Sequence, residues 1–407
     1  MTSRESAGSA ELRAPNSLAL AMSTTGDPTD PAMSSGWPAS LSLALQEVVG
    51  RLVPVSDLPS RRIAAAALVV GALRGVRASD LRRPNLAKAR LRRVGEAGGA
   101  YVAARARTVD FQLARAGELD GFIQNGADYG VRAPIPMATF QDSTVVQAVE
   151  SYDWPHLRGL SARDLDGLVK RQHAAYTSAA ACCAASHWVK DSIVSDYGIP
   201  SSRVHVVGLG ANHRFTERDG GRRDWARPRF LFVGVDWERK NGQSVLNAFG
   251  EVRDRFPEAT LDLVGGHPRV ELAGVRGHGH LAIDEQGARE ELASLYSQAT
   301  AFVMPSLHEP SGTVHVEAAE AGIASIGTTR GGAATCIGDG GFVVDPSDPR
   351  ELVNAMLELC NPATAARLGA LAHRHAQQFT WRKVAERIVR ALAISNVDVA
   401  GLAPFID

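Results

Sequence analysis

The sequence has few cysteines and no excess of charge of either sign. Four cysteines occur among 407 residues, and none forms the CxxC pair that zinc and redox sites commonly use. Lysine and arginine together number 44, as do aspartate and glutamate, so the formal net charge is zero. A chain without net charge has no overall field to attract a nucleic-acid backbone. We therefore expect no nucleic-acid partner.

Long apolar runs are also missing. The longest, Ile63–Leu73, covers 11 residues, whereas a helix that spans a bilayer needs about 18 or more. The run Ser17–Met22 is too short for the apolar core of a signal peptide. We therefore expect a cytoplasmic protein. We expect Cys182 and Cys183 to be reduced thiols in an alanine-rich core helix.

The composition is nevertheless that of a folded protein. Apolar residues make up 45% and charged residues 22% of the chain, which is enough to bury substantial cores. At about 150 residues per domain, the length predicts two large domains. Residues 1–40 are rich in small and polar residues and show no hydrophobic period, so we expect a disordered extension there.

The second half has the clearer pattern, because short apolar runs alternate with amphipathic segments. This order predicts a parallel sheet covered by helices. The expected strands are Phe230–Val235, Leu261–Val264, Ala301–Met304, Ile323–Ile326 and Phe342–Val344. In the first half only two weak strands stand out, Gly121–Gln124 and Ile135–Phe140.

Two loops after expected strands carry residues suited to binding a sugar nucleotide. In the run after Ala301–Met304, Gly312 and Thr313 open a helix whose N–H groups favour a phosphate. Glu309 and Glu317, eight positions apart, can accept hydrogen bonds from hydroxyl groups. The loop that follows Gly234 carries the adjacent cations Arg239 and Lys240, which can neutralise charge on a diphosphate.

These runs resemble a known family. The runs FVGVDWERKNG (232–242) and MPSLHEPSGTVHVEAAEAG (304–322), with Gly265-Gly266 between them, are similar to the C-terminal half of retaining glycosyltransferases of family 4. The resemblance extends over residues 185–385. It implies an α/β protein of the GT-B fold, with two Rossmann-like, doubly wound domains facing across a cleft.

The resemblance also implies a domain plan. Residues 41–205 would form the acceptor-side domain and residues 206–380 the domain that binds the nucleotide sugar. Residues 381–407 would form a helix that packs back towards the N-terminal domain, followed by a tail.

The resemblance assigns roles to individual residues. Glu309 would position the donor sugar, and Glu317 would hold the ribose. Lys240, with Arg239, would bind the diphosphate and stabilise the charge that develops on it. Further donor contacts are assigned to Gly234, Gly312 and Thr313.

The sequence departs from the family pattern at two places. Val235 stands where the family often has an arginine, so that Arg239 would have to replace it. In the first domain Gln141 stands where a histidine is common, which leaves Asp142 as the polar candidate for the catalytic site. The family's usual first strand near the N-terminus is not evident in the sequence.

The function that follows is the retaining transfer of a hexose from a nucleoside-diphosphate sugar to a hydroxyl acceptor, a glycan or a lipid-linked molecule, in surface polysaccharide or glycolipid assembly. The donor is a substrate, so no cofactor is expected. His278, His280, His308 and His315 lack further ligands at suitable spacing, and we expect no metal. Two alternatives stay open, a noncatalytic sugar-nucleotide-binding or scaffolding subunit and a GT-B sugar-nucleotide epimerase.

One basic segment also has two interpretations. Residues 74–93 contain seven arginines and one lysine against a single acid, Asp80. Such a segment can contact anionic lipid, which would place the protein at the inner face of the membrane. It can equally be the solvated face of a basic helix.

Overall fold

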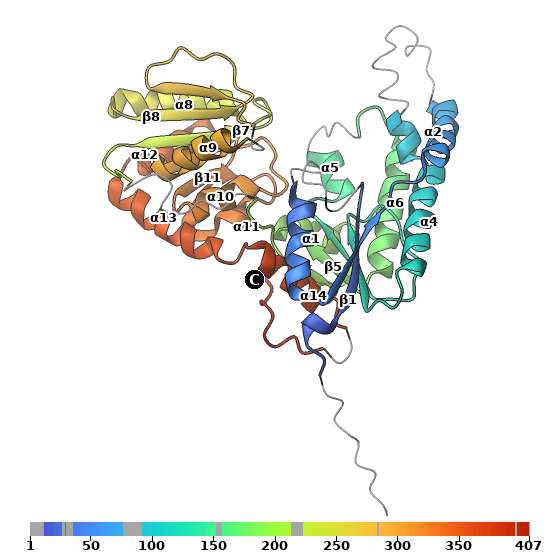
Figure 1. The fold of residues 1–407 in the computed structure, drawn as a ribbon. Coiled ribbons are helices and arrows are strands. Elements are labelled where there is room, and N and C mark those ends of the chain that lie inside the picture. Colours follow the sequence, from blue (N-terminus) through green and yellow to red (C-terminus); the bar gives the residue numbers. More distant parts are fainter. Residues whose placement is uncertain are drawn as a thin grey trace, which may run out of the picture.

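The computed structural model describes residues 12–26, 29, 36–75, 92–151, 157–212, 223–282, 285–394 and 397–406. Within these residues the chain forms two α/β domains, each built on a six-stranded parallel sheet. Figure 1 shows them as two lobes, with the N-terminal domain in blue and green and the C-terminal domain in yellow and orange. The expected architecture of two Rossmann-like domains is confirmed.

The sheet of the N-terminal domain has the strand order β2-β1-β3-β4-β5-β6. Its strands are β1 (Ala19–Thr24), β2 (Arg51–Ser56), β3 (Gly121–Asn125), β4 (Met137–Gln141), β5 (Ala181–Ala184) and β6 (Val204–Val206). Its helices are α1 (Trp37–Val48), α2 (Arg61–Gly75), α4 (Gly99–Arg115), α5 (Val145–Ser151), α6 (Ala162–Ser178) and α7 (His187–Ser195). Short 3-10 turns cover Pro15–Ser17 and Ser201–Arg203.

The prediction that residues 1–40 form a disordered extension is wrong for the part that the structure describes. Strand β1 lies between β2 and β3, and Leu20, Ala21 and Met22 are fully buried. The apolar run is too short for a helical period, but a buried parallel strand needs only five or six residues. Strand β1 is the N-terminal strand that was not evident in the sequence. Helix α1 follows it and begins at Trp37.

The sheet of the C-terminal domain has the order β12-β11-β10-β7-β8-β9. Its strands are β7 (Arg229–Gly234), β8 (Thr260–Gly265), β9 (Val275–Gly279), β10 (Ala301–Val303), β11 (Ala324–Thr328) and β12 (Gly341–Val344). Its helices are α8 (Gly242–Arg255), α9 (Gln286–Gln298), α10 (Thr313–Glu320), α11 (Ala333–Ile337), α12 (Pro349–Glu358) and α13 (Pro362–Ala376), with a 3-10 turn at Gly338–Gly340.

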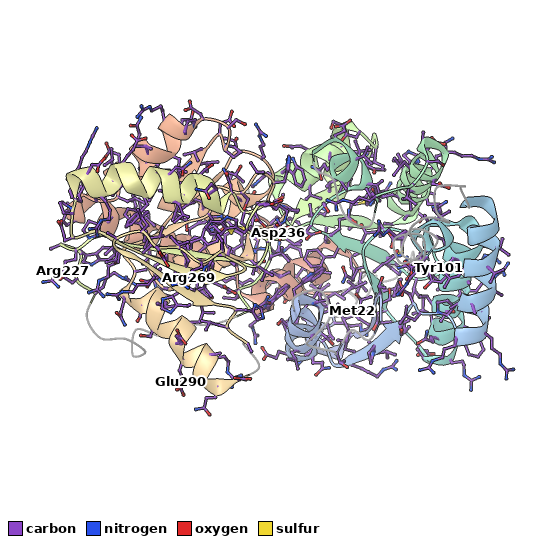
Figure 2. All side chains as sticks on the ribbon, turned by 90° about the horizontal axis from the view of Figure 1, so that it is seen from above. Met22, Tyr101, Arg227, Asp236, Arg269 and Glu290 are labelled. Carbon is purple, nitrogen blue, oxygen red and sulfur yellow. The ribbon has the colours of Figure 1, made fainter. Side chains whose placement is uncertain are left out.

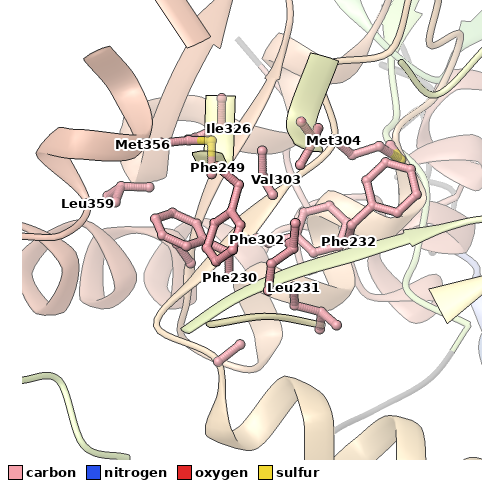
Figure 3. Packing of buried hydrophobic residues seen from close by; sticks show 14 of the residues in the cluster. Phe230, Leu231, Phe232, Phe249, Phe302, Val303, Met304, Ile326, Met356 and Leu359 are labelled. Carbon is pink, nitrogen blue, oxygen red and sulfur yellow. The ribbon is translucent and has the colours of Figure 1, made fainter. Parts of the chain in front are cut away.

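The core of this domain is aromatic at its centre. Figure 3 shows Phe230 and Phe232 of β7 packed with Phe249 of α8 and Phe302 of β10. The Phe230 and Phe249 rings meet edge to face, with their centroids 6.2 Å apart. Burial of such side chains fixes the neighbouring strands β7 and β10, whose following loops carry the predicted site.

The five strands predicted for the second half are all present, within one or two residues of the predicted bounds. Strand β9 was not predicted, because its sequence VRGHG has two glycines and no apolar alternation. The interpretation of Cys182 and Cys183 as helical is wrong: both lie in the buried strand β5. Alanine and cysteine are small enough to fit either a helix or a parallel strand covered on both faces.

After the C-terminal sheet the chain returns to the first domain. Helix α14 (Trp381–Ala391) buries Val384 and Ile388 in the same core as Leu41 and Leu45 of α1. In Figure 1 this helix, in red, lies beside α1. The last part of the chain therefore belongs structurally to the N-terminal domain.

Candidate functional site: a charged pair at the switch point of the C-terminal sheet

The site lies where the order of the C-terminal sheet reverses. Strands β7, β8 and β9 run to one edge of the sheet, and β10, β11 and β12 run to the other. Ligands of doubly wound sheets bind beyond the carboxyl ends of the strands at such a point. The loops that leave β7 and β10 meet there, and the Leu307 N–H donates to the Arg239 carbonyl over 2.8 Å.

Lys240 and Glu309 form a buried ion pair between these two loops. The Lys240 Nζ donates to Glu309 Oε2, and the two residues are only 8% and 6% exposed. The Ser306 hydroxyl also donates to Oε2 over 3.1 Å, and the Gly312 N–H donates to Oε1 over 3.3 Å. Both carboxylate oxygens of Glu309 therefore accept hydrogen bonds within the protein.

The charges of this pair depend on each other. Burial lowers the pKa of Lys240, and the Glu309 charge opposes that effect. Burial alone would raise the pKa of Glu309, but the Lys240 ammonium outweighs it and keeps that pKa below its ordinary value. The site thus holds a carboxylate and a cation in fixed positions within a poorly solvated environment.

Arg239 is the more accessible of the two cations. Its side chain is 36% exposed, its Nη1 lies 3.7 Å from Glu309 Oε2, and the same Nη1 donates to the His308 carbonyl over 3.1 Å. Asp236, at the head of this loop, lies on the side of the domain that faces the N-terminal domain (Figure 2). A guanidinium in this position can move onto an anionic ligand without leaving a buried charge unpaired.

Glycine is required at two positions of the predicted site. A Cβ atom at Gly234 would lie 2.9 Å from Lys240 Cγ, so the glycine leaves the space that the lysine stem occupies. Gly312 precedes α10 with a φ of 72°, a left-handed conformation that favours glycine. Thr313 is partly exposed as the first residue of α10, where backbone N–H groups have no partner within the helix.

Glu317 lies in the same helix but makes a different contact. The residue is 5% exposed, and the Tyr296 hydroxyl of α9 donates to the Glu317 Oε2 over 3.4 Å. Burial and the nearby Glu317 charge raise the pKa of Tyr296, which keeps its hydroxyl protonated and able to donate. The ribose role of Glu317 stays a prediction. Tyr296 was not identified as a site residue from the sequence.

The N-terminal domain presents Asp142 to this site. Asp142 directly follows β4 and is partly exposed. Burial raises its pKa, and the negative charge of Glu309 in the other domain raises it further. Gln141 is engaged inside its own domain, where its Nε2 donates to the Tyr176 hydroxyl over 2.5 Å. Asp142 is therefore the polar residue at the end of β4 that interacts electrostatically with the donor-side pair.

A second polar cluster follows the neighbouring strands of the N-terminal sheet. Arg105 donates to Asp57, after β2, over 2.5 Å and to Asp128, after β3, over 2.9 Å. The Arg105 guanidinium also lies over the Tyr129 ring, 5.1 Å from its centroid. Burial is the main influence on Asp57 and raises its pKa. The carboxyl edge of this sheet is thus lined with carboxylates whose positions are fixed by Arg105.

The domains also touch beside the donor loops. The backbone N–H of His187, at the start of α7, donates to the Thr335 hydroxyl of α11 over 3.1 Å. A Cβ atom at Gly332 would lie 2.6 Å from the Ser186 hydroxyl oxygen. Neither contact could be predicted from the sequence, because residues 148 and 146 positions apart share no local pattern.

The histidines considered as metal ligands are dispersed or buried. His315 of α10 is fully buried, and burial lowers its pKa to about 4. His278 lies between Asp262 and Glu291, with ring nitrogens 2.9 and 2.8 Å from their carboxylate oxygens. Among the described residues, no group of three or more histidine, cysteine, aspartate or glutamate side chains is arranged to hold a metal ion.

Two further predictions concern the membrane. No helix in the described parts of the chain is long and apolar enough to cross a bilayer. The basic segment 74–93 lies mostly outside the described residues, since 76–91 are not described.

The sequence of the C-terminal domain is similar to those of known glycosyltransferases. Residues 227–361 match the family model described as Glycosyl transferases group 1. The D-inositol 3-phosphate glycosyltransferase of Streptomyces avermitilis is 32% identical over 218 residues, which cover 47% of each chain. The mannosylfructose-phosphate synthase of Agrobacterium fabrum is 27% identical over 226 residues, 49% of each chain. The matched region thus spans about half the length of these relatives.

Solved structures are similar in fold over more of this chain, although their sequence identity to it is lower. The sucrose-phosphate synthase of Thermosynechococcus elongatus has a TM-score of 0.59 at 17% identity and covers 92% of this chain and 98% of its own. The Anabaena protein HepE, solved with UDP and glucose, has a TM-score of 0.54 at 14% identity, over 92% and 99% of the two chains. The site and these likenesses identify the chain as a GT-B protein that resembles the group 1 glycosyltransferases.

Proposed function

We propose that this protein is a retaining glycosyltransferase that moves a hexose from a nucleoside-diphosphate sugar to a hydroxyl group. The observation that carries the proposal is the buried Lys240–Glu309 pair, placed with Arg239 at the switch point of the C-terminal sheet. The relatives are named for transfer to, or synthesis of, sugar and inositol phosphates, and one structural neighbour was solved with UDP and glucose. These names support the class of reaction.

The proposed chemistry follows from where charge develops. When the bond between the sugar and the diphosphate breaks, negative charge accumulates on the departing diphosphate. Arg239, Lys240 and the N–H groups at the start of α10 would stabilise that charge. Glu309, held by three donors, would accept a hydrogen bond from a donor-sugar hydroxyl.

In the proposed retaining path the acceptor hydroxyl attacks from the face that the diphosphate leaves. The C–O bond to the acceptor forms as the C–O bond to the diphosphate breaks, and a phosphate oxygen takes the acceptor's proton. These protein cations would supply the charge stabilisation that a metal supplies elsewhere. Asp142 and the cluster around Arg105 would form the polar surface that meets the acceptor.

We also propose that the protein contacts an anionic membrane peripherally, from the cytoplasmic side. Helix α2 leaves apolar side chains in water, with Ile63 51%, Val69 58% and Val70 42% exposed. Arg61 and Arg62 at its start are also exposed. An apolar helix face flanked by arginines fits a surface of anionic lipids. Such a position would give access to a lipid-linked acceptor.

Two measurements test the proposed function. Thermal unfolding with a panel of nucleoside diphosphates and their sugars identifies the donor, because a ligand at 100 times its dissociation constant stabilises the fold by about 2.7 kcal/mol. Proton NMR of the reaction with that donor then gives the anomeric configuration of the product. Tight binding without turnover of any donor favours a noncatalytic subunit, and conversion of the donor to an epimer favours an epimerase.

A further inference from the structure

The two passages of the chain between the domains lie against each other. The first begins with Val207, directly after β6, and the second covers residues 377–380, between α13 and α14. A Cβ atom at Gly208 would lie 3.1 Å from Cδ1 of Phe379, and one at Gly210 would lie 2.4 Å from Cγ of Trp381. Any change in the angle between the domains must therefore involve both passages together.

Arg387 of α14 joins these passages to the C-terminal tail. It is one of the largest fully buried side chains in the described chain, at 1% exposure. Its Nη1 donates to the Val207 carbonyl over 3.0 Å and to the Gln378 carbonyl over 2.7 Å. Its Nε donates to the Pro404 carbonyl over 2.5 Å. One planar guanidinium thus holds three separate segments, of which the one at Val207 lies 180 positions away in the sequence.

These partners are unusual for a buried cation. Among the residues that the structure describes, Arg387 forms no ion pair. Burial lowers its pKa to about 10, and Glu386 on the same helix only partly opposes this. A buried charge without a counter-ion is costly, and an apolar side chain of similar size would stabilise the core better. The retained property is the geometry of the guanidinium, which fixes several acceptors at defined angles.

The junction also reaches the donor-side helices. Val206, Phe379 and Ile406 pack in one buried cluster with Val316 of α10 and Cys336 of α11. Val316 directly precedes Glu317, and the Cys336 thiol donates to the carbonyl of Ser311 over 3.0 Å. The segments that Arg387 holds are therefore in contact with the elements that carry the donor site.

We propose that Arg387 is a positioning residue that sets the angle between the two domains, and with it the separation of Asp142 from the Lys240–Glu309 pair. Its significance for catalysis rests on the proposed function. The effect of Arg387 on the angle between the domains does not depend on the proposed function, and it can be measured without any donor.

The test compares Arg387→Met and Arg387→Lys with a matched control on the same helix. Arg382 has a side chain that is 58% exposed and pairs with Glu386, so Arg382→Met removes an arginine from α14 without touching either passage. Spin labels on Leu43→Cys of α1 and Leu272→Cys of the C-terminal domain report the distance between the domains. Both positions are exposed, and the four native cysteines are buried. For each variant, calorimetry also measures the affinity for UDP, and a kinetic assay measures donor turnover.

We expect Arg387→Met to broaden the distance distribution and to lower kcat at least tenfold, while UDP affinity changes less than twofold. Arg387→Lys should narrow the distance distribution again and recover part of kcat. Arg382→Met should match the unsubstituted protein in both measurements. An unchanged distance distribution in folded Arg387→Met would overturn the proposal. If the unsubstituted protein turns over no donor, the proposed function fails while the distances still decide the role of Arg387.

A second variant covers the case in which Arg387→Met does not fold. Ending the chain at Leu402 removes the Pro404 acceptor and the pairing of Ile406 N–H with the Val206 carbonyl. This variant should fold and show the same broadening. If it folds with an unchanged distribution, or if it also fails to fold, Arg387 serves stability alone and the proposal is wrong.

Discussion

Lys240 and Glu309 lie 69 positions apart in the sequence, and the fold joins them in a buried ion pair. They meet because β7 and β10 are neighbours in the sheet and the loops that follow them leave the same edge. The pair places a fixed carboxylate beside a desolvated cation before any ligand arrives. Such preorganised charge stabilises a transition state more than charge that must first reorganise.

Glu317 gives the first prediction. If its carboxylate accepts hydrogen bonds from ribose hydroxyls, Glu317→Ala should weaken binding of the nucleoside diphosphate by about 1.5–3 kcal/mol, the value of a charge-assisted hydrogen bond. Calorimetric titration measures this change. Glu320→Ala, three positions later in the same helix, is the matched control and should leave the affinity unchanged. Equal affinities in both variants would remove Glu317 from the nucleotide site.

His315 gives a prediction about pH and stability. Its pKa is lowered to about 4 in the folded protein, below the ordinary value of 6.5, because both ring nitrogens are buried beside the Lys240–Glu309 pair. Between these values the unfolded chain binds a proton that the folded chain does not. The free energy of unfolding should therefore fall as pH falls from 6.5 towards 4, by up to about 1.4 kcal/mol per pH unit.

Denaturant unfolding across this pH range checks the prediction. His315→Leu should flatten the profile, whereas His280→Leu, at an exposed position, should keep the slope of the unsubstituted protein. A His315→Leu profile as steep as that of the His280→Leu control would show that other groups cause the pH dependence.

Asp142 tests the acceptor side. Because Asp142 belongs to the N-terminal domain and the Glu309 charge acts on it, Asp142→Asn should lower donor turnover and leave nucleoside-diphosphate affinity within about twofold. Steady-state kinetics and calorimetry separate the two effects. Asp166→Asn, at an exposed position of α6, controls for the loss of a carboxylate from the same domain. Full turnover in Asp142→Asn would place the catalytic surface elsewhere.

The exposed face of α2 gives a prediction about membranes. Replacement of Ile63, Val69 and Val70 by serine should reduce the fraction of protein that sediments with phosphatidylglycerol vesicles, because it removes apolar area that lipid would cover. Leu43→Ser, at a comparably exposed position of α1, should have little effect. Failure of the unsubstituted protein to sediment with these vesicles at low salt would rule out the contact.

The sequence predicted the C-terminal domain far better than the N-terminal one. Strands β7 and β10 contain continuous apolar runs, and β8 carries Leu261, Leu263 and Val264 around Asp262. Amphipathic helices separate these strands, so the parallel sheet and the loops at its edge follow from the pattern. The pairing of Lys240 with Glu309 did not follow from the pattern. It depends on which strands are neighbours, and a single sequence does not state that order.

The N-terminal domain was harder to predict from the sequence because its strands are short and built largely from small residues. Strand β1 has the sequence ALAMST, with Thr24 as its one β-branched residue, and β5 has ACCA, with none; neither strand contains an aromatic residue. Their strand conformation comes from burial between neighbouring strands and helices, which is a tertiary effect. The cluster of Arg105, Asp57 and Asp128 was missed for the same reason, since three separate elements supply it.

The most direct test of the account is proton NMR of donor turnover in EDTA, with the nucleoside-diphosphate sugar that gives the largest thermal shift. The proposed mechanism predicts a product with the anomeric configuration of the donor, formed at the same rate with and without EDTA. It also predicts that Lys240→Ala lowers that rate by about a hundredfold or more, with a smaller loss of donor affinity. Inversion at the anomeric carbon, or turnover that EDTA abolishes and manganese restores, would contradict it.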